Sequence, residues 1–298
     1  MAASRRTAVT ENAALDPTAL RSWLGRTREC TDTLTPRLVE AYVATLSPHL
    51  APAVPGAVPP AIHWCLAPGA VANSRMEADG HPRAGDFLPP LPLPRRMWAG
   101  GRIETAALLQ PGDRVVRHSK IAAITRKEGR SGMLGFVTIE HEFTTERGVA
   151  IRERQDLVYR EAPPPSGEAS AGAAGAADVA PPTECEQVWA VRASPVLLFR
   201  YSALTFNSHR IHYDLPYATG VEGYAGLVVH GPLQASLLLN LAAAIGGSTP
   251  RVFDYRGITP LIAGGVFFVC GRREADCTLR CWTQSATGVT CMLAAASW

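Results

Sequence analysis

The sequence predicts an α+β fold in which two halves repeat one order of elements, a helix followed by an antiparallel sheet. Three observations lead to this prediction. A stretch of small and proline residues at 162–183 divides the chain near its middle. Each half contains a helical pattern before several strand-like runs separated by turns. The helix of the second half is apolar on nearly every side, so it requires a sheet curled around it.

The first half, residues 1–161, begins with helical patterns and continues as strands. A helix is expected over 15–27, where Asp16 can cap and Pro17 occupies the first turn, and another over 36–46 with its apolar residues on one face. A Pro-rich loop should follow from 48 to 94. Strand-like runs then cover 102–109, 114–126, 132–145 and 150–159, joined by the turn sequences PGD, KEGRSG and TERG.

Residues 162–183 contain almost only Ala, Pro, Gly, Ser and acidic residues. Such a segment cannot bury enough side chain to offset its ordering entropy, so we predict a flexible linker. The second half, 184–298, should contain the buried helix at 233–245, which Gly246 and Gly247 end. Strand-like runs follow it at 257–261, 264–272, 276–284 and 289–297.

Composition limits the classes of function. The chain has 298 residues, 47% of them hydrophobic, and a net charge of +3 without a basic stripe, so no nucleic-acid partner is expected. The N-terminus lacks the apolar region of a secretory signal, and no apolar run reaches the roughly 18 residues of a membrane span. An organelle transit peptide stays open as an alternative. The seven cysteines have no C-x-x-C spacing, which favours reduced thiols in the cytoplasm, with zinc binding the minor alternative.

The segment from Phe199 to Ala235 carries most of the functional information. Asn207, His209, His212 and Asp214 lie close together in it, and His230-Gly231 then opens the apolar helix. Free backbone N–H groups and the helix dipole both favour negative charge at a helix start. Polar chemistry placed just before such a start indicates a site.

Two parts of the chain resemble a known family. The pattern Y-x-x-L-T-x-N-x-H-x-I-H from Tyr201 to His212, followed by His230-Gly231, resembles the hydratase-2 motif of MaoC-like (R)-specific enoyl-CoA hydratases. The segments LTFNSHRIHYD, VEGYAGLVVHGPLQA and GDFLPPLPLPRRMWAGGRIE resemble the branch of mesaconyl-C4-CoA hydratase, itaconyl-CoA hydratase and mitochondrial-type 3-hydroxyacyl-thioester dehydratases. This resemblance implies a tandem (double) hotdog fold and a hydro-lyase of class EC 4.2.1. The implied substrate is a short branched or dicarboxylic enoyl-CoA.

Three residues are the candidates for catalysis. His212 suits the base that takes a proton from water, because its ordinary pKa lies near neutral pH. Asn207 occupies the position where the broader family has Asp, and an amide cannot accept that proton, so Asn207 is expected to hold the water instead. The backbone N–H of Gly231 suits the enolate oxygen of the thioester. Two of them have a structural alternative: His212 as an ordinary core histidine, and Asn207 as an Asx-turn or cap residue.

Other residues are candidates for binding the acyl-CoA, whose phosphates Arg binds well. They are His230, Tyr201, Arg200, Arg95 and Arg96, although an arginine is by default a solvated charge and His230 could equally serve packing. His209 and Asp214 are expected to hold the loop. The first half lacks an N-x-H-x-x-H pattern, so we expect one active site, in the second half, with a degenerate first half that shapes the acyl pocket.

No metal or redox cofactor is expected, because hydration is redox-neutral, and coenzyme A enters only as part of the substrate. The family suggests a homodimer. Two alternatives stay open: an acyl-CoA thioesterase, which attacks the carbonyl carbon, and a non-catalytic acyl-CoA-binding protein in which Asn207 marks lost activity.

Overall fold

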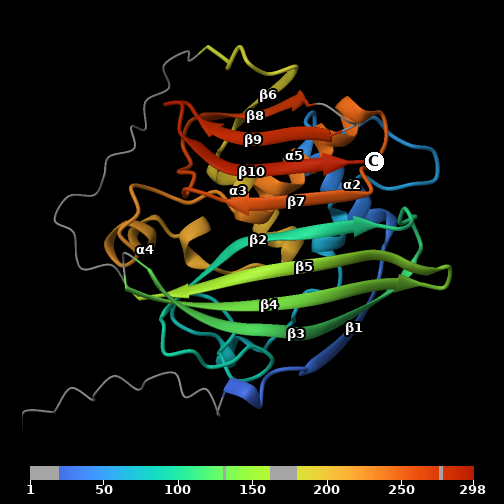
Figure 1. Cartoon of the computed structure of the whole chain (residues 1–298). Coiled ribbons are helices and arrows are strands. Elements are labelled where there is room, and N and C mark those ends of the chain that lie inside the picture. Colours follow the sequence, from blue (N-terminus) through green and yellow to red (C-terminus); the bar gives the residue numbers. More distant parts are fainter. Residues whose placement is uncertain (1–19, 130–131, 162–179, 275–277) are drawn as a thin grey trace, which may run out of the picture.

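A computed structural model describes residues 20–129, 132–161, 180–274 and 278–298. Its centre is one ten-stranded sheet with the order β1-β3-β4-β5-β2-β7-β10-β9-β8-β6, and every pairing is antiparallel (Figure 1). The strands are β1 (Thr27–Thr33), β2 (Arg95–Thr105), β3 (Arg114–Gly129), β4 (Gly132–Thr145), β5 (Gly148–Arg160), β6 (Gln187–Arg192), β7 (Val252–Gly257), β8 (Val266–Arg273), β9 (Thr278–Ser285) and β10 (Thr290–Ser297). The α-helices are α2 (Pro36–Leu46), α3 (Pro195–Thr205), α4 (Leu215–Gly220) and α5 (Gly231–Gly246), and the 3₁₀ turns are η1 (Ile62–Cys65), η2 (Asn73–Arg75) and η3 (Arg210–His212).

The sheets of the two halves join edge to edge. Strand β2 pairs with β7 from Gly100 opposite Arg256 to Glu104 opposite Val252. A Cβ at Gly100 would lie 2.6 Å from the carbonyl oxygen of Tyr255, so a residue without a side chain is needed where the two strands meet. The predicted α+β double hotdog is confirmed, with its two sheets continuous in space.

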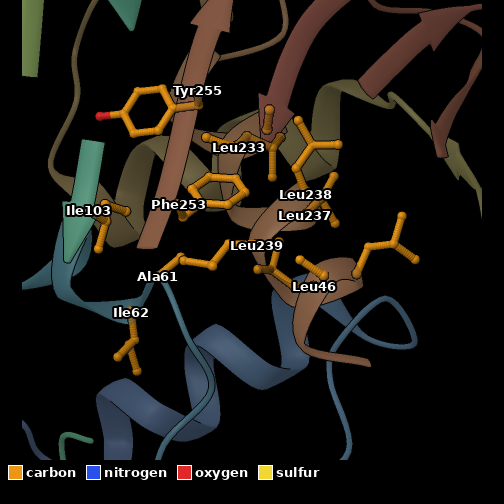
Figure 2. Packing of buried hydrophobic residues seen from close by; sticks show 14 of the residues in the cluster. Leu46, Ala61, Ile62, Ile103, Leu233, Leu237, Leu238, Leu239, Phe253 and Tyr255 are labelled. Atoms are coloured by element: carbon orange, nitrogen blue, oxygen red, sulfur yellow. The ribbon is translucent and has the colours of Figure 1, made fainter. Parts of the chain in front are cut away.

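Helix α5 is the buried helix of the second half, as predicted. Its residues from Leu233 to Ala243 are all buried. Figure 2 shows Leu233, Leu237 and their neighbours packed against Phe253 of β7. Burying each such leucine is worth about 1.5–3 kcal/mol, so this helix anchors the fold. The helix ends at Gly247, whose φ of 78° is the left-handed conformation that glycine adopts readily.

Helix α2 has a different place in the first half. It packs against α3 and η1, and its buried residues are Tyr42, Thr45 and Leu46. The Tyr42 hydroxyl donates to the carbonyl oxygen of Pro60, 3.0 Å away. On β3 and β4, Arg117, Ser119, His141 and Phe143 line a cavity.

Several predicted boundaries are wrong. The helix expected over 15–27 falls partly outside the described residues, and within them Ser22 to Gly25 form a turn while Thr27 already begins β1. Strand β1 is an edge strand with an exposed, alternating pattern that gives little apolar signal. The strand expected at 102–109 is instead β2, which starts directly after Pro94. In place of the strand expected at 257–261, β7 ends at Gly257. The N–H of the next residue, Ile258, donates to the carbonyl oxygen of Cys291.

The remaining expected elements are confirmed to within a few residues, although β6, α3 and α4 were not predicted. The loop from 48 to 94 is irregular apart from η1 and η2, yet Ile62 and Leu66 in it are buried. Most of the expected linker lies outside the described residues. The cysteines within the described ranges are free. No helix of the described chain is long and apolar enough to cross a membrane.

Candidate active site

A cavity of about 710 Å³ is lined by residues from both halves of the chain. The second half contributes Asn207, His209, His212 and Gly231. The first half contributes Trp98, from the segment that resembles the family, and residues outside both resembling parts, among them His63, Trp64, His81 and Arg117. The site is therefore shared between the halves.

The polar segment before α5 is held by short-range caps. Helix α3 ends at Phe206, whose φ of 51° turns the chain. The side-chain oxygen of Asn207 then accepts the N–H of His209 at 2.9 Å, which is an Asx turn. Asp214 accepts the N–H of Tyr217 at 3.0 Å and so caps α4. Because the Asn207 oxygen is occupied, its NH₂ group is the end that can act on a ligand.

The ring of His212 has a defined tautomer. Nδ1 donates to the carbonyl oxygen of Val228, 2.7 Å away, so Nε2 is the basic nitrogen. Burial lowers the pKa of His212 to about 4, even though the bond to Val228 opposes this shift. The imidazole is therefore neutral at pH 7, the state a general base needs.

His230 and Tyr201 lie behind His212 and are not among the residues that line the cavity. The ring of His230 stacks on that of His212 with centroids 3.6 Å apart, and its Nε2 is 2.8 Å from Ser202 Oγ. The ring of Tyr201 meets His230 edge to face at 5.2 Å. Both were predicted to bind substrate, but this placement instead suits support of the His212 ring.

Gly231 is the first residue of α5 and lines the cavity. A Cβ there would lie 2.8 Å from Cε3 of Trp98, whose ring is stacked on Tyr255 with centroids 4.5 Å apart. A side chain at position 231 would have to displace this tryptophan. Gly231 thus places a helix start, where negative charge is favoured, at the wall of the cavity.

The three predicted arginines have separate places. Arg96 lines the cavity, and its charge contributes, after burial, to lowering the pKa of His81. Arg95 donates to the carbonyl oxygen of Glu222 at 2.7 Å and pairs with its carboxylate at 3.2 Å. Arg200 is exposed on α3. Only Arg96 of the three is brought to the cavity.

Sequence reasoning missed the loop around Gly80. Asp79 accepts from Nδ1 of His81 at 2.8 Å, and the His81 ring lies 4.1 Å from that of His209. Burial tends to raise the pKa of Asp79, but the hydrogen bonds and charge of His81 hold it well below its usual range. Burial lowers the pKa of His209 to about 2, with a further contribution from His81. The signal available was a turn sequence, Asp-Gly-His-Pro, inside a loop that carries no motif.

The same three side chains, Asp79, His81 and His209, have ligand atoms within 4.8 Å of one another. Carboxylate and imidazole donors are those that divalent metals accept in proteins. The hydrogen bond between Asp79 and His81 gives the group a second, metal-free explanation. The expectation that no metal takes part stays a prediction.

Comparisons with known proteins place this site in a family. Residues 61–263 match the family model of hydroxyacyl-thioester dehydratase type 2. The chain is 42% identical over 258 residues to a mesaconyl-C(4)-CoA hydratase of Chloroflexus aurantiacus, covering 86% of this chain and 89% of that protein.

Two solved structures support the fold. A MaoC-like dehydratase has a TM-score of 0.69 at 15% identity, covering 94% of this chain and 99% of that one. A Mycobacterium tuberculosis protein described as a double hotdog has a TM-score of 0.55 at 14% identity, covering 92% and 96%. The matched range includes both the loop of His81 and the segment of His212. This chain therefore belongs to the hydroxyacyl-thioester dehydratase type 2 family and is a hydro-lyase.

Proposed function

We propose that the chain reversibly adds water to the double bond of a short branched or dicarboxylic enoyl-CoA, of the mesaconyl-C4-CoA or itaconyl-CoA type. The similarity to the Chloroflexus hydratase over most of both chains supports this substrate class. The observation that carries the chemistry is the pairing of a neutral His212 with the N-terminus of α5 in one cavity.

His212 is the base in this proposal. Its Nε2 takes a proton from the water that attacks Cβ, and the Asn207 amide donates to the oxygen of that water. As the C–O bond forms, negative charge develops on the thioester oxygen. This oxygen then accepts a hydrogen bond from the N–H of Gly231. His212 then returns the proton to Cα on the same face, so the addition is syn.

Arg96 is the proposed contact for the coenzyme A phosphates, since it is the predicted arginine that lines the cavity. The reaction needs no metal or redox cofactor, because an imidazole and a helix terminus supply the base and the oxyanion donor. We further propose a cytoplasmic homodimer.

The test is a spectroscopic assay of purified protein with mesaconyl-C4-CoA, itaconyl-CoA and crotonyl-CoA, following loss of the conjugated double bond. We expect turnover of at least one dicarboxylic substrate. His212→Ala should lower kcat by about 10²- to 10⁴-fold, the usual contribution of a general base. His118→Ala is the matched control, because that histidine is half exposed on β3. Undiminished turnover by His212→Ala would remove the proposed base.

The same samples separate the alternatives. A thioesterase would release free coenzyme A thiol, which a thiol reagent detects. A non-catalytic binding protein would bind the thioester with no change in absorbance. Neither alternative is favoured, because the relative that spans most of the chain is a hydratase.

A further inference from the structure

The first half contributes a group of polar side chains to the cavity, which we name the polar floor: Arg117 of β3, His141 of β4, Glu153 of β5 and His63 of η1. Strand register brings them together. Residue 119, two positions after Arg117, pairs with His141, which pairs with Glu153. The ring of His63 packs on the other side, against Phe143, with centroids 5.2 Å apart. A hydrocarbon chain could not form hydrogen bonds with these polar groups.

Two members of the polar floor have ring or guanidinium nitrogens without a hydrogen bond, although Nε2 of His63 lies 3.8 Å from Oε2 of Glu153. His63 is 1% exposed, and neither of its ring nitrogens has a hydrogen-bond partner in the described structure. Nε of Arg117 is likewise buried without a partner, and its guanidinium forms no ion pair with any described residue. Buried donors left unpaired are costly, so proteins rarely keep them unless a ligand or water completes them. Their place on a cavity wall indicates a ligand.

The neighbouring charges favour an anionic ligand. Oε1 of Glu153 accepts from Trp64 Nε1 at 2.9 Å and from the Tyr255 hydroxyl at 3.1 Å. Burial raises the pKa of Glu153, which favours its neutral acid form. Burial, with a smaller effect of the Arg117 charge, lowers the pKa of His63 and of His141 to about 3, so both rings are neutral. Arg117 places a positive charge on the cavity wall that forms no ion pair with a described residue, although this charge also lowers the pKa of Glu153 against the larger effect of burial.

We propose that Arg117, with His63 beside it, binds a carboxylate at the acyl end of the substrate. The guanidinium offers a planar pair of donors that fits a carboxylate, and a His63 N–H can add a third. An acyl group without the carboxylate gains nothing from these donors, so it should bind more weakly than the dicarboxylic acyl group. For the enoyl substrate this inference rests on the proposed hydratase function.

Two other arginines of the cavity, Arg96 and Arg160, are rivals for this role, and Nε of Arg160 is likewise buried without a hydrogen-bond partner in the described structure. Arg96 lies near His81 and His209, whose pKa values it helps to lower. This places Arg96 beside His81 and His209 rather than among the polar floor. Arg96→Met and Arg160→Met variants are therefore included in the binding experiment below, and a carboxylate-specific loss in either of them instead of Arg117→Met would overturn the proposal.

Binding is measured first, by calorimetry with the saturated thioesters glutaryl-CoA and butyryl-CoA, which cannot be hydrated. We expect the wild-type protein to prefer glutaryl-CoA and Arg117→Met to lose about 100-fold of its affinity for it, the scale of a lost charged hydrogen bond. Affinity for butyryl-CoA should stay within about threefold. Arg114→Met is the matched control, because Arg114 is exposed on the same strand. Equal losses for both ligands, or a carboxylate-specific loss in Arg96→Met or Arg160→Met instead, would overturn the proposal.

Turnover is measured second, with mesaconyl-C4-CoA and crotonyl-CoA. Arg117→Met should lower kcat/KM for the dicarboxylic substrate by about 100-fold and leave that for crotonyl-CoA nearly unchanged. Arg117→Lys, which keeps the charge without the fork, should recover part of the loss. A melting curve for each variant shows that it folds. If the wild type hydrates no thioester but prefers glutaryl-CoA to butyryl-CoA, the hydratase proposal fails and the carboxylate site stands. If it hydrates a thioester but shows no preference for glutaryl-CoA, the carboxylate site fails and the hydratase proposal stands.

Discussion

At the scale of single residues, the two reactive side chains are each fixed by a bond to the backbone. Nδ1 of His212 is bound to Val228, and the oxygen of Asn207 is bound to the N–H of His209. Each bond occupies one end of the side chain and leaves the other end for the cavity. The Asx-turn explanation of Asn207 and its role toward water are therefore compatible.

The aspartate variant of Asn207 tests this arrangement. Asn207→Asp keeps the acceptor for the His209 N–H, so the fold should survive, but it places a negative charge in the site. That charge favours protonated His212 and so raises its pKa from about 4. We expect the acid limb of the kcat/KM profile against pH to move to higher pH. Asn207→Ala is the control, which should lower kcat with no such move; an unchanged acid limb in Asn207→Asp would place residue 207 away from the base.

The structure brings the three candidates for catalysis to one cavity but only one of the five candidates for substrate binding. Asn207, His212 and Gly231 occupy motif positions at a helix start, and the structure brings them to one cavity. Arg95 and Arg200 were candidates for binding acyl-CoA because of their charge. The charge of a residue does not indicate the direction in which its side chain points. Arg117, His141 and Glu153 of the polar floor lie on strands with the alternating pattern of any sheet. No local sequence pattern therefore indicated that Arg117 faces a cavity.

At the scale of elements, the loop around Gly80 is what completes the site. The Ser208 hydroxyl donates to the carbonyl oxygen of Gly80 at 2.6 Å, and the N–H of Arg210 donates to that of Asp79 at 2.8 Å. These bonds dock a first-half loop on the segment that carries His209. The φ of Gly80 is +88°, and a Cβ there would overlap the carbonyl oxygen of Ser208.

Gly80→Ala should therefore damage both stability and activity. We expect the free energy of unfolding to fall by more than about 2 kcal/mol, from backbone strain and from overlap with a backbone atom that cannot move alone. Gly85→Ala is the matched control, since Gly85 has a φ of +99° but open space around its Cβ position. It should cost about 1 kcal/mol and leave kcat unchanged. Urea unfolding and steady-state kinetics measure both, and equal effects of the two variants would mean that the docking is unimportant.

The cluster of Asp79, His81 and His209 gives a test of metal dependence. If its hydrogen bond is the reason for the arrangement, dialysis against a chelator should leave kcat at the wild-type value and the melting temperature unchanged. Metal analysis of the dialysed protein is the control. Loss of activity that zinc or another divalent ion restores would contradict the metal-free mechanism.

Element order could be predicted from the sequence, but the packing of the elements could not. The periodicity of α2 predicts a helix with one apolar face. The same face can pack on a sheet or on another helix, and in the structure α2 packs against α3. Only the three-dimensional arrangement shows that the inner face of the first half's sheet is left to the cavity. Edge strand β1 was missed because its alternation between exposed and half-buried residues lacks strong hydrophobicity.

At the scale of the whole molecule, the fold buries several histidines in neutral form. The pKa values of His63 and His141 are lowered to about 3, that of His212 to about 4 and that of His209 to about 2, in each case chiefly by burial. In the unfolded chain these groups titrate near 6.5. The unfolded state therefore binds more protons below about that pH.

Stability should consequently fall as the pH is lowered from about 6.5 toward the folded-state values, and these groups should have no effect above it. Each buried histidine contributes up to about 1.4 kcal/mol per pH unit. Urea unfolding followed by tryptophan fluorescence between pH 8 and pH 5 measures this slope. His141→Gln should reduce the slope by about one proton, whereas His118→Gln, at an exposed site, should leave it unchanged. Equal stability at pH 5 and pH 8 would contradict neutral burial.

The junction of β2 and β7 has a consequence for how this architecture can diverge. A ladder of five residue pairs makes each half the edge partner of the other, so neither can be deleted without exposing an unpaired strand. The first half, whose sequence has no N-x-H-x-x-H pattern, is thus needed to pair with β7, while the side chains on its inner face can vary. Such a division lets recognition of the acyl group evolve on one half without disturbing the chemistry on the other.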